Sequence, residues 1–324
     1  MIEFVERHYG VECHPSAIKS LGNAGGFSGA RFWKLQTPRG ELCLRKWPQS
    51  HPPVDRLQWI HAILAHAERH GCEFLPVPIQ TRSDNSFFEA NGHLFELTRW
   101  LPGNADLAAS GCDQKLRAAI QSLAELHAAT HELVATESVS PGIVQRGTIV
   151  AKLMQGELAQ LSNATRSSAV HPFHDQCKTI LGLATPHVEP LQQKLKSITS
   201  VEVTDQPCVR DVWHDHFLFA DENVTGLIDF GAMQVDTIAT DLARLLGSLD
   251  RHHDDVWLKG TSMYQESRKL TDVDFEFIRV FHESNVVLSG LNWVRWLLVE
   301  NRTFENQTGV RKRLEDIEWA LREA

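Results

Sequence analysis

The sequence predicts an α+β protein with a β-rich first part and a mainly helical remainder. Three observations indicate this: turn-separated, strand-like runs over residues 1–100, a break at Pro102-Gly103, and helical periodicity from there onward. A chain of 324 residues is longer than one small core can serve. We therefore expect two domains, a β-rich lobe at 1–100 and a helical lobe at 101–324.

Composition narrows the class of protein. An apolar content of 42% and a charged content of 23% are ordinary for a globular protein, and a formal net charge of −9 argues against a nucleic-acid partner. The six cysteines are scattered without a C-x-x-C pair, which indicates a reducing compartment and no structural zinc. The N-terminus has no signal-peptide pattern, and no apolar run could span a membrane. These features favour a cytoplasmic protein.

The first elements are expected to be a helix followed by a hairpin. Residues 1–20 are expected to form a short amphipathic helix that leads into Ile18, and a glycine-rich stretch at 22–29 follows. A strand at 30–36, a turn at 37–40 and a strand at 41–47 come next. Glycine lets backbone N–H groups approach an anion closely, so the stretch could cover phosphates. A plain turn without a ligand is the alternative.

One helix and a second hairpin complete the predicted β-rich part. Apolar residues at helical spacing predict a helix over 54–70, after Pro52-Pro53 and before Gly71. Strands near 86–90 and 93–100 flank Asn91-Gly92, the strongest short hairpin signal in the chain. The sequence therefore predicts a mostly antiparallel sheet with one crossing helix.

The second part is predicted to be helical with one β-rich interruption. The expected helices cover roughly 113–133, 147–162, 171–197, 236–249, 254–267, 272–299 and 309–322.

The interruption at 209–231 carries the clearest chemical pattern. It reads as a strand, a polar loop, a short strand, a tight turn, another strand and then Asp-Phe-Gly. Asp211 and Asp229 each stand where a strand-like run meets a loop. Phosphoryl transfer needs one carboxylate to orient the attacking hydroxyl and one to hold the metal on the nucleotide phosphates. The two aspartates satisfy this requirement.

Together these features resemble the bilobal protein-kinase-like fold, and more closely the aminoglycoside phosphotransferase or choline-kinase-like family of small-molecule kinases. The resemblance covers nearly the whole chain and is strongest at 205–245. It implies an ATP- and Mg²⁺-dependent transfer of the γ-phosphate to a hydroxyl of a small molecule. Aminoglycosides, choline, homoserine and amino sugars are all compatible acceptors.

The resemblance assigns roles in the catalytic loop at 209–219. V-R-D-V-W-H-D-H matches the kinase pattern H-R-D-x-x-x-x-N, so Asp211 falls on the catalytic aspartate and His216 on the second metal ligand. Asp229 matches the Mg²⁺ ligand of the Asp-Phe-Gly triplet at 229–231. Asp241 is expected to brace the loop rather than react.

The resemblance also assigns nucleotide-binding residues in the first lobe. Arg45 stands where the family has a lysine, and strand alternation favours Arg45 over Lys46 as the residue in the cleft. The predicted helix at 54–70 has no acid in its middle to pair with this cation; Gln58 or His61 occupies the region. The residues assigned to the nucleotide lie in the glycine stretch, on the second strand and in a hinge at 96–103: Gly25, Gly26, Phe27, Ser28, Gly29, Arg45, Glu96 and Arg99.

Two other functions stay open. Departures from the family pattern at Val209, Arg45 and His216 suit a nucleotide-binding pseudokinase that is weakly active or inactive. A metal-dependent hydrolase is the third reading, because His214 and His216 would point the same way on an extended segment beside the two aspartates.

Overall fold

A computed structural model describes residues 2–24, 26–49, 51–134, 136–253 and 255–324. The chain forms two compact units, which we call the sheet unit (Met1–His131 with Trp213–Gln234) and the helical unit (Glu132–Val212 with Val235–Ala324). The segment Trp213–Gln234 thus belongs with the N-terminal residues, although the sequence places it in the middle of the helical part. The predicted lobe boundary at residue 100 falls inside the sheet unit. The hinge predicted at 96–103 stays a prediction.

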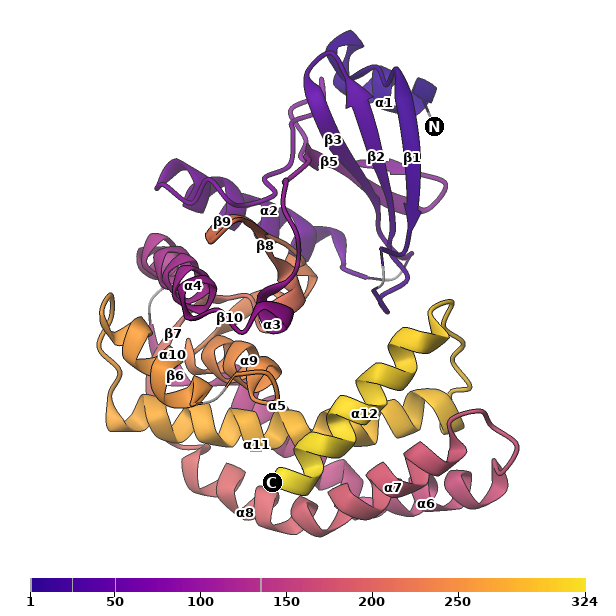
Figure 1. The fold of residues 1–324 in the computed structure, drawn as a ribbon, viewed down its shortest axis with the longest axis vertical. Helices are drawn as coiled ribbons and strands as arrows, with labels where there is room; N and C mark the ends of the chain where they lie inside the picture. The colour runs from indigo at the N-terminus through magenta and orange to yellow at the C-terminus, as the bar shows by residue number, and fades with distance from the viewer. Residues whose placement is uncertain (1, 25, 50, 135, 254) are drawn as a thin grey trace. The chain divides into compact units, whose positions relative to one another are not determined.

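The sheet unit is built on a five-stranded antiparallel sheet, as predicted (Figure 1). Its strands, in the spatial order β1-β2-β3-β5-β4, are β1 (Ala17–Gly22), β2 (Arg31–Thr37), β3 (Gly40–Lys46), β5 (His93–Arg99) and β4 (Phe88–Ala90). The Asn91-Gly92 turn joins β4 to β5 with positive φ at both residues, which is the geometry that a tight hairpin requires.

The N-terminal residues correct the expected helix. Helix α1 covers only Ile2–Tyr9, because Gly10 has φ 97°, a backbone conformation that favours glycine and ends the helix. A short 3₁₀ turn, η1 (Val11–Cys13), follows, and β1 pairs with β2 along its length. The last turn of α1 packs on β4, since the His8 ring stacks on Phe88 with the centroids 4.2 Å apart.

The remaining elements of the sheet unit include three helices and the β-hairpin that precedes Asp229. Helices α2 (Val54–Arg69) and α4 (Asp113–Val134) match the predictions, and α3 (Leu107–Ser110) is a single turn. The hairpin is formed by β8 (Phe217–Ala220) and β9 (Asn223–Leu227), flanked by 3₁₀ turns η4 (His214–His216) and η5 (Phe230–Ala232).

The Pro102-Gly103 break is where this hairpin attaches. Asn104 and Phe219 exchange backbone hydrogen bonds of 2.9 Å in both directions. A Cβ on Gly103, which has φ 112°, would lie 2.7 Å from the Phe219 carbonyl oxygen. Glycine is therefore required there for two reasons, its backbone conformation and the close approach of β8.

The helical unit is organised around its longest helix, α11 (Asp272–Val294), which packs against α9, α7, α12 and α8 (Figure 1). A small sheet, in the order β10-β7-β6, completes the unit. β6 and β10 were not predicted, because three or four residues between helices give no readable period. The elements are β6 (Thr136–Val139), α5 (Pro141–Lys152), η2 (Leu153–Glu157), α6 (Leu158–Ser167), α7 (His174–Ala184), η3 (Thr185–His187), α8 (Val188–Ile198), β7 (Glu202–Cys208), β10 (Gln234–Asp236), α9 (Ala239–Leu249), α10 (Val256–Gln265), α11, η6 (Arg295–Val299) and α12 (Gln307–Glu323).

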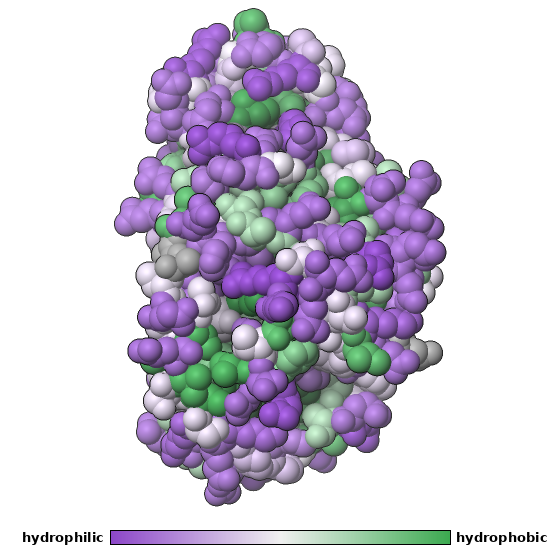
Figure 2. All heavy atoms as spheres, turned by 90° about the vertical axis from the view of Figure 1, so that its left-hand side faces the viewer, coloured by the Kyte–Doolittle hydropathy of each residue, from purple (hydrophilic) through white to green (hydrophobic). Residues whose placement is uncertain are grey.

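The structure describes all six cysteines, and Figure 2 shows one face of the surface. All six cysteines, each among the described residues, are free thiols. Within the described ranges, no helix combines the length and apolar character needed to cross a bilayer. On the face drawn in Figure 2, hydrophilic side chains predominate and hydrophobic ones gather only in small groups.

A glycine contact in the helical unit gives a stability test. A Cβ on Gly142, near the start of α5, would lie 3.0 Å from Cγ of the buried Asp236 and 3.1 Å from a ring carbon of Phe281. Gly142→Ala should destabilise the protein by about 1–3 kcal/mol, because neither neighbour can move without disturbing buried contacts. Chemical denaturation followed by circular dichroism measures this.

Gly147→Ala is the matched control on the same helix, since a Cβ there meets nothing within 4 Å. That variant should be as stable as the wild type, or gain about 0.5–1 kcal/mol from the better helix former. Equal destabilisation of the two variants would show that the close contact at Gly142 has no effect.

Candidate functional site

A buried cation on β3 is the centre of the site in the sheet unit. Arg45 lies opposite Glu96 of β5 in the strand register. Its Nη2 donates a hydrogen bond to Asp229 Oδ1 at 3.1 Å, and Nη1 lies 4.0 Å from Glu96 Oε1. As strand alternation predicts, Arg45 turns toward the Asp-Phe-Gly aspartate, and the adjacent Lys46 side chain leaves the strand on the other side.

Glu96 is a buried acid whose carboxylate is fixed by two donors. Its Oε2 accepts from Trp47 Nε1 at 2.9 Å and lies 2.8 Å from His61 Nε2. Burial favours the neutral acid, but the His61 hydrogen bond and the positive charge of Arg45 outweigh it, so the pKa of Glu96 is lowered. The carboxylate is therefore a charged partner for Arg45.

Aromatic rings hold the guanidinium group of Arg45 in place. Its Cζ lies 3.4 Å from the centroid of the Trp47 ring and 5.2 Å from that of Phe32. Contact with the face of an indole ring stabilises a cation. Trp47 thus supports Arg45 through its face and Glu96 through its N–H group.

The Asp-Phe-Gly triplet presents its acid to this cation. Asp229 has φ 67°, which turns the chain sharply after β9, and its side chain is 44% exposed. Phe230 is buried, while Gly231 lies against the Trp47 ring, where a Cβ would be 3.2 Å from Cζ3. One oxygen of Asp229 therefore meets Arg45 while the carboxylate remains accessible to a metal ion.

His216, the predicted second metal ligand, lies near the other oxygen of Asp229. Its Nε2 is 4.0 Å from Asp229 Oδ2, and its Nδ1 accepts a hydrogen bond from the Trp213 backbone N–H at 3.3 Å. In a neutral imidazole with an accepting Nδ1, the proton is on Nε2. This geometry suits a hydrogen-bond donor toward Asp229 or a phosphate better than a metal ligand.

The structure corrects the argument for a hydrolase site at His214 and His216. That argument assumed extended backbone, but residues 214–216 form the 3₁₀ turn η4. At three residues per turn, positions i and i+2 point in different directions. The His214 ring instead faces Asp215, with 3.2 Å between Nε2 and Oδ1, so this alternative is not favoured.

The glycine stretch forms the exposed loop between β1 and β2. The Gly26 N–H donates to the Asn23 carbonyl at 2.9 Å, which closes a turn, and Gly29 has φ 82°. Gly26, Ser28 and Gly29 are exposed and Phe27 is partly buried. Gly25 lies outside the described residues.

The predicted hinge needs a correction at its start. Residues 96–99 are the end of β5, paired with β3, and only 100–103 lie beyond the strand. The Glu96 side chain points into the buried cluster. Arg99, an odd number of residues away, is exposed and donates to Glu68 of α2 at 2.7 Å. Arg99 is therefore not grouped with Arg45, and its contact with a nucleotide stays a prediction.

In the helical unit, the predicted catalytic acid is held by an arginine that the sequence did not single out. Both Nε and Nη2 of Arg244, on α9, lie 2.8 Å from Oδ1 of Asp211. The Asp211 side chain is 48% exposed. A carboxylate with this exposure can receive a hydroxyl proton.

Asp241 braces the catalytic loop, as expected. It is fully buried, and its carboxylate accepts the backbone N–H groups of Val209 at 2.8 Å and Arg210 at 2.6 Å. Arg210 has φ 65°, a strained conformation for a residue with a side chain. The two charge-assisted hydrogen bonds stabilise that strained turn directly before Asp211.

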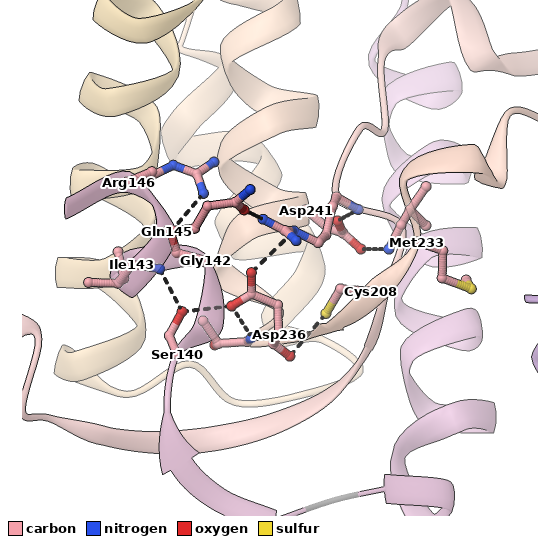
Figure 3. Close-up of polar contacts among 12 residues, drawn as sticks. Ser140, Gly142, Ile143, Gln145, Arg146, Cys208, Met233, Asp236 and Asp241 are labelled. Carbon is pink, nitrogen blue, oxygen red and sulfur yellow. Dashed lines mark hydrogen bonds and ion pairs between the residues drawn. The ribbon is translucent and has the colours of Figure 1, made fainter. Parts of the chain in front are cut away.

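A second buried acid, Asp236, fixes the side chain of Arg210, with 3.3 Å between Asp236 Oδ2 and Arg210 Nε. Asp236 Oδ1 accepts from the Ser140 hydroxyl at 2.6 Å (Figure 3). Burial raises the pKa of Asp236, although Ser140 and Arg210 oppose the shift. Gln145 of α5 accepts from Arg210 Nη2 at 2.8 Å. Ser140, Gln145 and Arg244 were not predicted, because each is distant in sequence from the loop that it supports.

Comparison with solved structures identifies the fold. The chain is similar to a spectinomycin phosphotransferase in complex with ADP and spectinomycin (16% identity over 99% of this chain and 92% of that chain, TM-score 0.64). It is also similar to an aminoglycoside phosphotransferase from Alicyclobacillus acidocaldarius (14%, 100% and 96%, 0.66) and to a microcompartment-associated aminopropanol kinase (13%, 97% and 92%, 0.65). These likenesses confirm the predicted α+β, kinase-like fold.

Comparison of sequences identifies the family. None of the curated proteins matches this chain. The family model described as "Phosphotransferase enzyme family" (APH) matches residues 21–281. This range includes Asp211 and Asp229, and also Arg45 with its neighbours Trp47, His61 and Glu96. The predicted enzyme class is thereby confirmed. Because this match covers most of the chain, the protein belongs to the phosphotransferase enzyme family.

Proposed function

We propose that the protein transfers the γ-phosphoryl group of ATP, with Mg²⁺, to a hydroxyl group of a small molecule in the cytoplasm. The observation that carries this proposal is the contact between Arg45 and the exposed Asp229. A phosphate-binding cation and a metal-binding carboxylate stand side by side there, as phosphoryl transfer requires. A solved relative with ADP and another with AMP-PNP and Ca²⁺ support the choice of a nucleotide and a divalent metal.

The residues of the sheet unit fit a nucleotide. The guanidinium group of Arg45 contacts Asp229, whose side chain is 44% exposed, so it lies where a phosphate oxygen bound beside that carboxylate could be reached. A guanidinium group can contact two such oxygens at once. The exposed loop at 26–29 would cover the phosphates with backbone N–H groups. Residues 100–103, beyond the end of β5, would receive the base.

Asp229 would hold the metal, since carboxylate oxygens are the protein ligands that Mg²⁺ prefers. When bound, Mg²⁺ would neutralise charge on the β- and γ-phosphates. His216 would donate its Nε2 proton to a phosphate oxygen or to Asp229, with metal ligation as the less suitable role for this tautomer.

Asp211 would orient the acceptor hydroxyl and receive its proton. As the bond from phosphorus to the acceptor oxygen forms, the bond to the ADP oxygen breaks, so ADP and a phosphate monoester are the products. Arg244 holds Oδ1 of Asp211 and so fixes the carboxylate plane. Helical segments at 140–200 and 250–324 would form the acceptor pocket, for an aminoglycoside, choline, homoserine or an amino sugar.

A screen of small hydroxyl compounds in an ATP-consumption assay with Mg²⁺ tests the function. The expected result is acceptor-dependent release of ADP and a phosphorylated product visible by mass spectrometry. Failure to bind nucleotide at saturating ATP and Mg²⁺ would refute the proposal. Binding without turnover of any acceptor would instead point to the pseudokinase.

The Asp211→Asn variant tests the proposed acid. Its kcat should fall by about 10²–10⁴-fold, because the amide cannot take the hydroxyl proton, while nucleotide affinity stays unchanged. Steady-state kinetics and calorimetric titration with ADP measure the two quantities. Asp221→Asn, the same change in the exposed β8–β9 turn, should behave as wild type. Equal kcat values for wild type and Asp211→Asn would remove Asp211 from the mechanism.

The Asp229→Ala variant tests the metal site. Ligand present at 100 times its Kd stabilises a protein by about 2.7 kcal/mol, so saturating Mg²⁺ and nucleotide should raise the wild-type Tm. In Asp229→Ala the Mg²⁺-dependent part of that rise should disappear, because the metal loses its carboxylate ligand. Thermal melts with nucleotide in Mg²⁺ or in EDTA provide the measurement. A rise that is the same in both proteins would exclude Asp229 as a metal ligand.

A further inference from the structure

Helix α2 supplies no carboxylate from its middle to pair with Arg45. Helix α2 has only Asp55 in its first turn and Glu68 near its end, and Glu68 binds Arg99. His61 occupies the buried middle of α2. The carboxylate nearest to Arg45 on its own sheet is Glu96, directly opposite on β5.

We propose that Glu96 and His61 are the positioning residues that hold Arg45 for the nucleotide phosphates. This inference rests on the proposed function and deepens it. It assigns to a neighbouring strand the carboxylate that the sequence led us to seek on the helix, and the helix contributes through the imidazole of His61.

The two oxygens of Glu96 have different tasks. Oε2 takes both hydrogen bonds, at 2.9 Å from Trp47 Nε1 and 2.8 Å from His61 Nε2. Oε1 is left facing Arg45 Nη1 at 4.0 Å. Since two donors fix one oxygen, the carboxylate cannot rotate without breaking a buried hydrogen bond to a charged group, which is unfavourable.

His61 connects α2 to this carboxylate. Its Nδ1 lies 2.7 Å from Ser86 Oγ, while Nε2 lies 2.8 Å from Glu96. Both ring nitrogens lie at hydrogen-bond distance from a partner, so the orientation of the ring is fixed and His61 links α2 to β5. A change in the position of α2 would therefore affect Arg45 through Glu96 and not through a direct ion pair.

The charges explain why the pair is needed. The Arg45 side chain is only 11% exposed, and its guanidinium group faces the buried Glu96 on one side and the more exposed Asp229 on the other. A buried charge that loses its partner is strongly destabilised. Glu96 keeps the cation compensated from within the sheet, which leaves the Asp229 side for phosphate and metal.

Glu96→Gln and His61→Leu test the inference against wild type. Both should raise the KM for ATP and the Kd for AMP-PNP by about 10–100-fold, as expected for losing hydrogen bonds to a charged group. The KM for the acceptor should not change, because Asp211 is untouched. His61→Gln keeps an N–H donor for Glu96 and should recover most of the affinity that His61→Leu loses.

Two controls separate positioning from simple loss of stability. Glu89→Gln removes the same charge from an exposed site on β4, and should bind AMP-PNP as wild type. Thr81→Val removes the oxygen that accepts the backbone N–H groups of Ser83 at 3.3 Å and Asn85 at 3.1 Å, so it should lower Tm without changing nucleotide affinity. If Thr81→Val weakens AMP-PNP binding as much as Glu96→Gln does, the effect is stability alone and the inference fails.

A double-mutant cycle keeps the test decisive if Glu96→Gln folds poorly. In an Arg45→Met background the charge that needs Glu96 is absent, so adding Glu96→Gln should not weaken AMP-PNP binding further. Full additivity of the two changes would overturn the inference. A wild-type protein that binds no nucleotide refutes the proposed function itself, whereas wild-type binding with unchanged Glu96→Gln and His61→Leu affinities refutes only the positioning role.

Discussion

The hydrogen bond between Arg45 and Asp229 joins residues 184 positions apart in the sequence, and the local arrangement of the sheet unit depends on it. A guanidinium group taken out of water needs anions around it. Glu96 on one side and Asp229 on the other meet this need, and the Trp47 face covers what remains. The glycine of Asp-Phe-Gly packs closely on the same ring, because a Cβ at Gly231 would lie only 3.2 Å from Trp47 Cζ3.

Local patterns made much of this predictable. Asp211, the β8–β9 hairpin and Asp229 are indicated by order and spacing along one stretch, whereas Arg45 is singled out by the resemblance to small-molecule kinases. The Asn91-Gly92 hairpin and α2 carry signals inside a few residues, namely a turn dipeptide and an apolar stripe. The predictions of the two hairpins and of α2 rest on a period or a turn that the chain expresses without reference to distant residues.

The features that the sequence did not predict depend on contacts between residues that are far apart in the chain. Glu96 reads as part of a hinge in the sequence, and only the pairing of β3 with β5 shows that it faces Arg45. His61 and Glu96 are 35 residues apart, Asp211 and Arg244 are 33 apart, and Ser140 and Asp236 are 96 apart. β1 escaped because its pattern is short and its edges are polar; it becomes a strand by pairing with β2.

The catalytic loop shows how strain is held by buried charge. Arg210 adopts φ 65° directly before Asp211, a conformation that costs of order 1–3 kcal/mol without support. Asp241 binds its backbone N–H, and Asp236 binds its side chain. The charge of Arg210 is thus matched by an acid of the same unit, supplied by β10. A charged partner on a ligand or on a modified residue is not needed to orient this loop, so Asp211 is held in place before any acceptor binds.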